Sequence, residues 1–269
     1  MRLICHEDNK GLAASRNTGI RAAQGRYIAF LDGDDLWVLP AFVEKHVAVL
    51  ESDSHIGVTF SRYAYMNEQG EPTGDAWHTR VREPTLRQML HRNRAGSSFL
   101  ARRACLFEAG LFNETLRSCE DYELWLRVLH NTPYSMRLVP DIFYLYRLHN
   151  ASLTMDFSGF LRAADAVAAM VLRAMPDIPE KDVRRGQSES YRIASRRALA
   201  NGRVELARNQ IMAALRLYPP LPFVSLRAGL LLTLIMMQSA APETWRRRLY
   251  GFAAVCWRTT SQLRGRLLR

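Results

Sequence analysis

The sequence predicts an α/β domain over residues 1–156, followed by an α-helical region over residues 157–269. Two observations support this division. In the first part, short apolar runs typical of strands alternate with stretches at helical spacing, whereas the second part shows helical spacing alone. Hydrophobic residues make up 48% of the chain and charged residues 23%, so enough apolar surface is available for a packed core, which excludes a disordered polyelectrolyte.

Charge separates the same two regions. Residues 1–156 hold 18 basic and 19 acidic residues, whereas residues 157–269 hold 19 basic and 7 acidic residues, a net charge of +12. The four cysteines have no C-x-x-C spacing, which indicates neither a zinc site nor a disulfide scaffold and fits a reducing compartment. The first ten residues are too polar for a secretory leader, so we expect a cytoplasmic protein.

The chain opens with a pattern of strand, helix and strand. Residues 2–5 form a short apolar run, and residues 11–23 are rich in alanine with helical spacing that ends at Gly25. Residues 27–31 are continuously apolar, as expected of a buried parallel strand. This order predicts a right-handed βαβ unit.

The remaining elements of the first region follow from the same patterns. Apolar runs predict strands over residues 56–65, 97–101 and 134–146, the last interrupted at Pro140. Helical spacing predicts helices over residues 41–50 and 103–109 and from Glu120 onward. Polar and Gly/Pro-containing stretches predict a turn over residues 68–72 and a loop over residues 77–84.

The second region is expected to be helical throughout. Residues 188–217, broken at Asn201-Gly202, resemble one tetratricopeptide-like hairpin without a second copy. The apolar run over residues 228–237 is too short to span a bilayer, which takes about 20 residues, and predicts a buried or interfacial helix. Residues 244–269 place apolar residues on one helical stripe with arginines beside it, the pattern of a helix lying on an anionic membrane.

An acidic turn follows the expected strand over residues 27–31. Asp32, Gly33, Asp34 and Asp35 would lie at the carboxyl end of that strand, where open α/β sheets bind ligands. Close carboxylates repel one another, and a Mg²⁺ or Mn²⁺ ion shared with substrate phosphates relieves that repulsion. The alternative is a tight turn in which Asp35 caps the next helix. The turn alone supports both interpretations equally.

Two further motifs also allow two interpretations. Ser118 and Asp121 have the spacing of a capping box at the start of a helix, whereas a carboxylate fixed there could also act as a general base. His149 could complete the coordination of a cation begun by Asp34, although a lone histidine more often has a structural part.

The combination of these motifs resembles a bacterial family 2 glycosyltransferase. The resemblance covers roughly residues 1–156, with the same order and spacing of motifs. Four segments carry it: Asn9-Lys10-Gly11-Leu12-Ala13-Ala14-Ser15-Arg16-Asn17-Thr18-Gly19-Ile20, Ala29-Phe30-Leu31-Asp32-Gly33-Asp34-Asp35-Leu36-Trp37, Glu120-Asp121-Tyr122-Glu123-Leu124-Trp125-Leu126-Arg127, and Tyr146-Arg147-Leu148-His149 with Ser152.

The resemblance implies a GT-A fold, a mixed α/β sheet that binds a nucleotide-diphospho-sugar, and an inverting transfer to an acceptor hydroxyl. It implies that Asp34 binds a divalent cation, Mg²⁺ or Mn²⁺, with help from His149. It assigns Asp121 as the catalytic base. It implies that Asp32 contacts the ribose or a water molecule and that Glu120, next to Asp121, also contacts the substrate. Three further residues lie on the segment that borders the nucleotide in the family: Lys10, Arg16 and Asn17.

One departure from the family pattern concerns the start of the chain. Family members begin with a strand ending in a Tyr-Asn sequence and a second strand ending in paired aspartates, which together hold the base and ribose. This chain resembles the family only from the third strand onward, so we expect an N-terminally truncated domain with an uncovered sheet edge. Weak or absent sugar-nucleotide binding and poor solubility are the expected consequences.

The sequence allows two alternatives to an enzyme and indicates where an enzyme would bind its acceptor. One alternative to an enzyme is an inactive remnant whose arginine-rich C-terminal region docks on a membrane or a partner. Nucleic-acid binding is not expected, because the arginines alternate with leucines and no nucleic-acid motif is present. For an enzyme, residues 75–82 and 96–98 would face the acceptor, a cell-surface or lipid-linked glycan made at the inner face of the cytoplasmic membrane.

Overall fold

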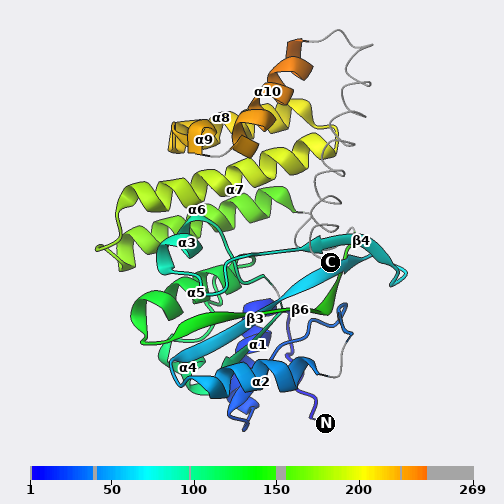
Figure 1. Cartoon of the computed structure of the whole chain (residues 1–269), viewed down its shortest axis with the longest axis vertical. Coiled ribbons are helices and arrows are strands. Elements are labelled where there is room, and N and C mark those ends of the chain that lie inside the picture. Colours follow the sequence, from blue (N-terminus) through cyan, green and yellow to red (C-terminus); the bar gives the residue numbers. More distant parts are fainter. Residues whose placement is uncertain (1, 39–40, 97, 150–155, 225, 241–269) are drawn as a thin grey trace. The chain divides into compact units, whose positions relative to one another are not determined.

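The computed structural model describes residues 2–38, 41–96, 98–149, 156–224 and 226–240 of the chain (Figure 1). These residues form two compact units, one ending at Val167 and the other beginning at Ala168. The division falls within helix α6 (Phe157–Ala174). The predicted boundary, after residue 156, lies immediately before this helix, whereas the two units divide within it, after Val167.

The first unit is built on a six-stranded mixed sheet. Its strands run in the order β1-β5-β3-β6-β2, with β4 paired to β3, and only the β3–β6 pair is parallel. The strands are β1 (Tyr27–Ala29), β2 (Leu36–Trp37), β3 (Ile56–Met66), β4 (Pro72–Trp77), β5 (Phe99–Arg102) and β6 (Ser135–Arg147). The predicted mixed α/β architecture is thus confirmed, with β3 and β6 at its centre.

Helices cover both faces of this sheet. They are α1 (Leu12–Ala22), α2 (Phe42–Ser52), α3 (Leu86–His91), α4 (Arg103–Glu108) and α5 (Glu120–Asn131). Phe99 packs edge-on against Trp125 of α5 with ring centroids 4.7 Å apart, whereas the next residue, Leu100, packs in a cluster with Leu50 of α2. Because successive strand residues point to opposite faces, α5 and α2 lie on opposite sides of the sheet.

The predicted opening βαβ unit does not form. Residues 2–5 make no strand and are exposed, with Leu3 at 83%, because none of the strands in the described part of the chain pairs with their backbone groups. The strand expected over residues 27–31 is limited to Tyr27–Ala29 and pairs antiparallel with β5 rather than parallel to an earlier strand. Of this predicted unit the helix, α1, and a shortened second strand, β1, form, whereas the first strand and the parallel pairing do not.

The other predicted elements of the first unit are confirmed within a few residues. Interruption of the last strand at Pro140 is confirmed as a bulge, since the register with β3 jumps from Val139 to Ile142. Proline has no backbone N–H to contribute to a ladder, so a bulge is where a central strand tolerates it. Strands β2 and β4 were not predicted, because β2 has only two residues and the first four of the six residues of β4 are exposed.

The second unit contains helices alone among its described residues. Two of them, α7 (Glu180–Ala200) and α8 (Val204–Leu217), span the residues of the predicted hairpin and are joined through Gly202 at a φ of 80°. The Ser195 and Ser188 hydroxyls of α7 donate to the carbonyls of Ala207 and Ala214 of α8, at 2.6 and 2.8 Å.

The last described helices are α9 (Leu221–Val224) and α10 (Leu226–Ala240). Ala228, Leu231 and Ile235 of α10 are buried in the core of this unit, whereas Leu230 and Met236 are more than half exposed. Among the described residues, none of the helices has the length and apolar character needed to cross a bilayer. The amphipathic helix predicted over residues 244–269 lies outside the described residues.

Candidate active site

The acidic turn lies between β1 and β2 at one end of the sheet. Its backbone closes as a tight turn, with the Asp35 N–H donating to the Asp32 carbonyl at 3.1 Å. Asp35 is 5% exposed and accepts hydrogen bonds from the Tyr144 hydroxyl at 2.5 Å and from the Arg147 backbone N–H at 2.8 Å. Burial raises the pKa of Asp35. The helix cap proposed for Asp35 is wrong, because β2 follows it and its carboxylate bonds to β6.

The Asp34 side chain is about half exposed and pairs with His149. The two side chains lie 2.9 Å apart between Nε2 and Oδ2, and they are 47% and 26% exposed respectively. The part of the chain that the structure describes holds no group of three or more metal-ligating side chains. One carboxylate oxygen and one imidazole nitrogen still fit a cation whose other ligands come from a diphosphate, as Mg²⁺ sites commonly do.

Arg16 of α1 connects the acidic turn to the start of α5. Its Nη2 atom pairs with the Asp32 carboxylate at 2.8 Å, and its Nη1 atom pairs with Glu120 at 2.7 Å. The Arg16 and Glu120 side chains are 10% and 8% exposed, so the pair between them is largely withdrawn from water, whereas Asp32 is 27% exposed. Arg16 thereby holds together Asp32 and Glu120, which the sequence predicted from two separate motifs.

Asp121 occupies the first turn of α5 next to Glu120. The predicted capping box is wrong: Cys119 is the N-cap residue, with a φ of 60° and no side-chain capping bond. The Asp121 carboxylate accepts hydrogen bonds from the Tyr122 N–H at 2.6 Å and from the Asn93 amide at 3.3 Å. Burial and the neighbouring Glu120 charge raise the pKa of Asp121 to about 7, against the opposing effect of Arg16. A carboxylate with these properties is suited to general-base chemistry.

The structure separates two other predicted residues from this group. Asn17 is 1% exposed, and its amide donates to the Phe112 carbonyl at 2.9 Å and to Glu114 at 2.8 Å while its oxygen accepts from the Phe112 N–H. Its side chain is therefore engaged in holding the segment before α5. Lys10 is exposed in the segment before α1. Substrate contacts of both residues stay predictions.

An aromatic cluster lies beside the site on β3, β4 and β6. Trp77 stacks on Tyr63 with ring centroids 5.3 Å apart and planes 3° apart, and Tyr63 also contacts Tyr146. Gly96 lies at a φ of 66°, where an added Cβ would come within 2.7 Å of Tyr63. Trp77 and Gly96, from the two segments predicted to face the acceptor, therefore both lie against Tyr63. Ser98 of the second segment is buried and forms a hydrogen bond with Ser61.

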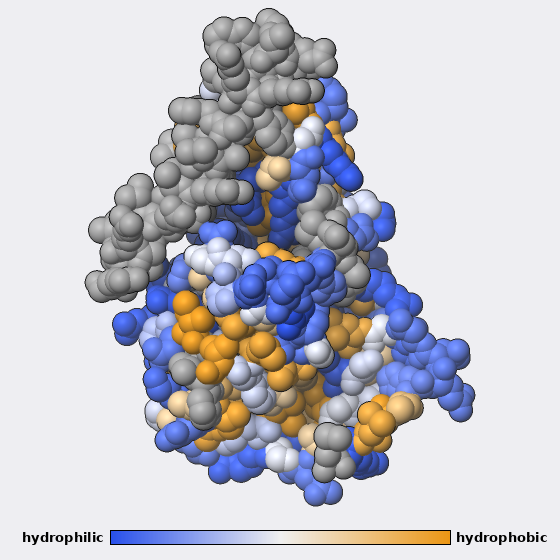
Figure 2. Space-filling model, turned by 90° about the vertical axis from the view of Figure 1, so that its right-hand side faces the viewer, coloured by the Kyte–Doolittle hydropathy of each residue, from blue (hydrophilic) through white to orange (hydrophobic). Residues whose placement is uncertain are grey.

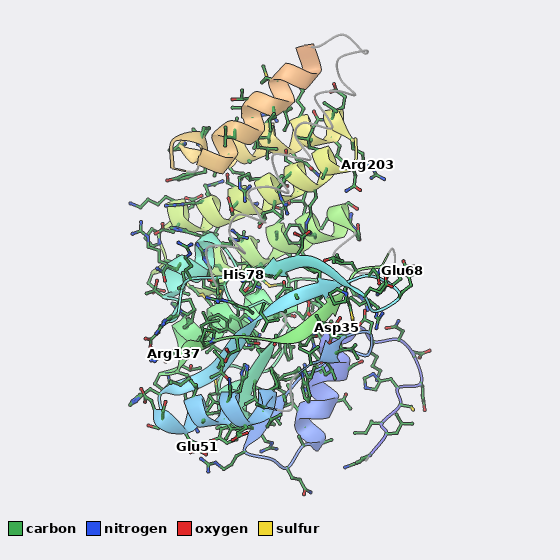
Figure 3. All side chains as sticks on the ribbon, turned by 45° about the vertical axis from the view of Figure 1, so that its right-hand side comes forward. Asp35, Glu51, Glu68, His78, Arg137 and Arg203 are labelled. Carbon is green, nitrogen blue, oxygen red and sulfur yellow. The ribbon has the colours of Figure 1, made fainter. Side chains whose placement is uncertain are left out.

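Sequence reasoning missed three residues of the site. Tyr144 and Asn93 bond to Asp35 and Asp121 respectively, and nothing in their sequence neighbourhood indicates those partners. Arg147 belongs to a motif that the sequence did single out, but its contacts to the acidic turn are visible only in the fold. Figure 3 shows Asp35 and Glu68 toward one end of the sheet, and Arg137 and Glu51 toward the other.

Apolar side chains are exposed in the segment that follows the acidic turn. Leu36, Trp37 and Val38 are each between 37% and 45% exposed, although Trp37 stacks on Phe42 of α2, and Leu31, directly before the turn, is 46% exposed. Figure 2 shows apolar residues gathered on the surface of the first unit. Exposed apolar surface of this kind is typical of sites that bind other molecules.

Comparison with known proteins decides the family. The sequence profile of the family described as "Glycosyl transferase family 2" matches residues 1–139, more than half of the chain. The chain belongs to glycosyl transferase family 2. The resemblance predicted from the sequence is confirmed, and the matched residues contain Lys10, Arg16, the acidic turn and Asp121.

Relatives of this family 2 chain come from archaea and bacteria. An uncharacterized glycosyltransferase of Methanocaldococcus jannaschii is 27% identical over 149 residues, which are 55% of this chain and 50% of that protein. The Escherichia coli UDP-Glc:alpha-D-GlcNAc-diphosphoundecaprenol beta-1,3-glucosyltransferase WfaP is 29% identical over 179 residues, or 64% of this chain and 67% of that protein. The chain spans only half the length of the M. jannaschii relative.

Solved structures of the same fold include Staphylococcus aureus TarS. The structure of TarS 1–349 in complex with UDP-GlcNAc matches with a TM-score of 0.52 at 16% identity, covering 94% of this chain and 73% of TarS 1–349. A longer TarS structure gives a TM-score of 0.51 at 17% identity, covering 91% of this chain and 44% of TarS. At these identities the likeness concerns the fold, and it supports the predicted GT-A-like sheet followed by helices.

Proposed function

We propose that the chain is an inverting glycosyltransferase that moves a sugar from a nucleotide-diphospho-sugar to an acceptor hydroxyl. The observation that carries this proposal is Asp121, a carboxylate of raised pKa that Arg16 and Glu120 connect to the acidic turn. The E. coli relative is named for a transfer from UDP-Glc, and one TarS structure contains UDP-GlcNAc, which supports a UDP-sugar as donor.

The reacting groups follow from this assignment. Asp121 accepts the proton of the acceptor hydroxyl while that oxygen bonds to the anomeric carbon, and the bond from this carbon to the diphosphate oxygen breaks. Attack opposite the leaving group inverts the configuration. Arg16 fixes the start of α5 relative to Asp32, which would contact the ribose or a water molecule. Lys10 is the cation that would face the phosphates.

Asp34 and His149 would hold a divalent cation, Mg²⁺ or Mn²⁺, together with the diphosphate of the donor. A cation bound there would offset the negative charge that develops on the leaving diphosphate. The protein contributes few ligands of its own, so we expect tight cation binding only when the donor or the nucleoside diphosphate is present.

For the acceptor we propose a lipid-linked glycan of cell-surface polysaccharide synthesis. The name of the E. coli relative specifies a sugar on diphosphoundecaprenol, and the exposed apolar segment after the acidic turn offers surface for such a lipid. Trp77 and Tyr63 offer aromatic faces for the acceptor sugar. We propose that the protein works at the cytoplasmic face of the membrane, with residues 244–269 as its peripheral contact.

UDP release from a panel of UDP-sugars tests this function. With Mn²⁺, a lipid-diphosphate-linked N-acetylglucosamine acceptor and donor concentrations high enough to offset the weak donor binding expected from the sequence, one donor should be turned over. Asp34→Asn should then raise the Mn²⁺ concentration for half-maximal rate at least about tenfold. The matched control is Asp141→Asn, an exposed carboxylate paired with Lys45, which should leave that concentration unchanged. Failure to turn over any sugar nucleotide would contradict the proposal.

The pH profile gives a second test. Asp121 must be ionised to accept a proton, and its pKa is raised to about 7, so kcat/KM should rise with pH up to that value and then level off. The free energy of unfolding changes with pH in the opposite direction to kcat/KM. Because the folded state holds this proton between the ordinary carboxyl pKa of about 3.9 and the raised value, Asp121 makes the free energy of unfolding fall as pH rises through that window. A rate plateau already reached at pH 5 would contradict the assignment.

A further inference from the structure

We propose that Arg147 is a positioning residue that braces the acidic turn against the turn between β3 and β4, and thereby sets the geometry of Asp34. The inference rests on the proposed function for its consequence, but the brace itself is a property of the fold. Arg147 is the last residue of β6 and is half-buried. Its hydrogen bonds to Asp35 and to the Glu68 carbonyl place it at the end of the sheet where Figure 3 shows these two residues.

The guanidinium of Arg147 binds backbone carbonyls of two different turns. Its Nε atom donates to the Asp34 carbonyl at 2.7 Å, and its Nη1 atom donates to the Glu68 carbonyl at 2.8 Å and the Asn67 carbonyl at 3.3 Å. Glu68 and Asn67 are separated from Asp34 by more than thirty residues of sequence. The planar guanidinium spans both turns at once, which a single lysine ammonium cannot do.

The backbone around Arg147 fixes the same turn from a second side. The Arg147 N–H donates to Asp35 Oδ1 at 2.8 Å, and the Tyr144 hydroxyl donates to the other oxygen of that carboxylate. The next residue, Leu148, donates its N–H to the Met66 carbonyl at 2.9 Å. Both the carboxylate of Asp35 and the carbonyl of Asp34 are therefore held by the end of β6.

The turn between β3 and β4, whose carbonyls Arg147 binds, is closed by its own hydrogen bonds. The Asn67 N–H donates to the Glu71 carbonyl at 2.9 Å, the Asn67 side chain bonds to both the backbone and the carboxylate of Glu71, and the Gly70 N–H donates to the Asn67 carbonyl. Gly70 has a φ of 89°, and an added Cβ would lie 3.6 Å from Arg147 Nη1. This closed turn gives Arg147 a fixed support.

These contacts hold two different groups of Asp34, its backbone carbonyl and its carboxylate, by residues at the end of β6 and directly after it. Arg147 holds its carbonyl, and His149, two residues further along the chain, holds its carboxylate. The angle at which the Asp34 carboxylate faces a cation thus depends on Arg147, although the guanidinium bonds to carbonyls rather than to a ligand. Loss of the brace should loosen both turns and weaken binding of the cation.

Hydrogen–deuterium exchange and Mn²⁺ binding on the full chain test the inference. In Arg147→Lys, amides of residues 32–36 and 67–71 should exchange at least about tenfold faster, and Mn²⁺ affinity in the presence of UDP, followed by electron paramagnetic resonance, should fall at least about fivefold. The matched control is Arg137→Lys on the same strand, whose side chain pairs with Glu83 at 3.2 Å and should change neither readout.

A second variant keeps the test decisive if Arg147→Lys folds poorly. Tyr144→Phe removes the hydroxyl group that bonds to the Asp35 carboxylate and to the Asp32 backbone, so it should speed exchange in residues 32–36 and leave residues 67–71 unchanged. Unchanged exchange in both turns of Arg147→Lys would overturn the brace, and faster exchange with unchanged Mn²⁺ affinity would overturn its effect on Asp34. Absence of Mn²⁺ binding by the parent chain would count against the proposed cation site, while the exchange result would still decide the brace.

Discussion

Asp121→Asn should lower kcat by about 10²- to 10⁴-fold, the contribution usual for a general base. Asparagine has almost the same shape, and its side-chain oxygen can still accept the hydrogen bond from the Tyr122 N–H. It cannot accept the proton of an acceptor hydroxyl. The variant should also lose the decline in stability with rising pH, because no buried carboxyl remains to ionise at this position. Steady-state transfer assays and urea unfolding at several pH values measure both effects.

Two comparisons separate the chemical effect of this substitution from a structural one. Asp141→Asn makes the same change of atoms at an exposed carboxylate on β6 and should keep the parent kcat. Donor KM should change little in Asp121→Asn, because the substituted group acts on the acceptor. If Asp121→Asn retained more than a tenth of the parent kcat, the base would have to be another residue.

Arg16→Met should lower the free energy of unfolding by about 3 kcal/mol, at the lower end of the range for breaking a buried ion pair. The substitution leaves the Glu120 carboxylate 8% exposed and without its cation, whereas Asp32, at 27%, recovers part of its hydration. It also removes the positive charge that holds the pKa of Asp121 down. The acid limb of the pH profile should therefore move to higher pH, together with a lower kcat at neutral pH.

A matched substitution at an exposed ion pair provides the control for Arg16. Lys45→Met removes a cation that pairs with Asp141 at 3.0 Å, but both side chains are about half exposed. Exposed pairs of this kind contribute about 0 to 1 kcal/mol, so the loss of stability should be several times smaller. Equal losses in the two variants, measured by urea unfolding, would show that Arg16 does not hold a buried network.

Local sequence patterns predicted most of the first unit for a physical reason. The helix from Glu120 and the strands over residues 56–65 and 134–146 have apolar spacing that matches one face of a regular element, and all three form. The opening strand failed because an apolar run becomes a strand only when a neighbouring strand pairs with its backbone. The capping box failed because Cys119 takes the N-cap position in a left-handed conformation.

Sequence alone therefore determined the family, the order of the main elements and the acidic residues that could carry chemistry, because these depend on residue type and short-range spacing. Tertiary structure decided how those residues are used. Arg16 pairs with a carboxylate 104 positions away, and Arg147 joins two turns that no spacing rule connects. Burial, which raises the pKa of Asp121 and engages Asn17 in the core, arises only when distant segments pack together, so no local pattern records it.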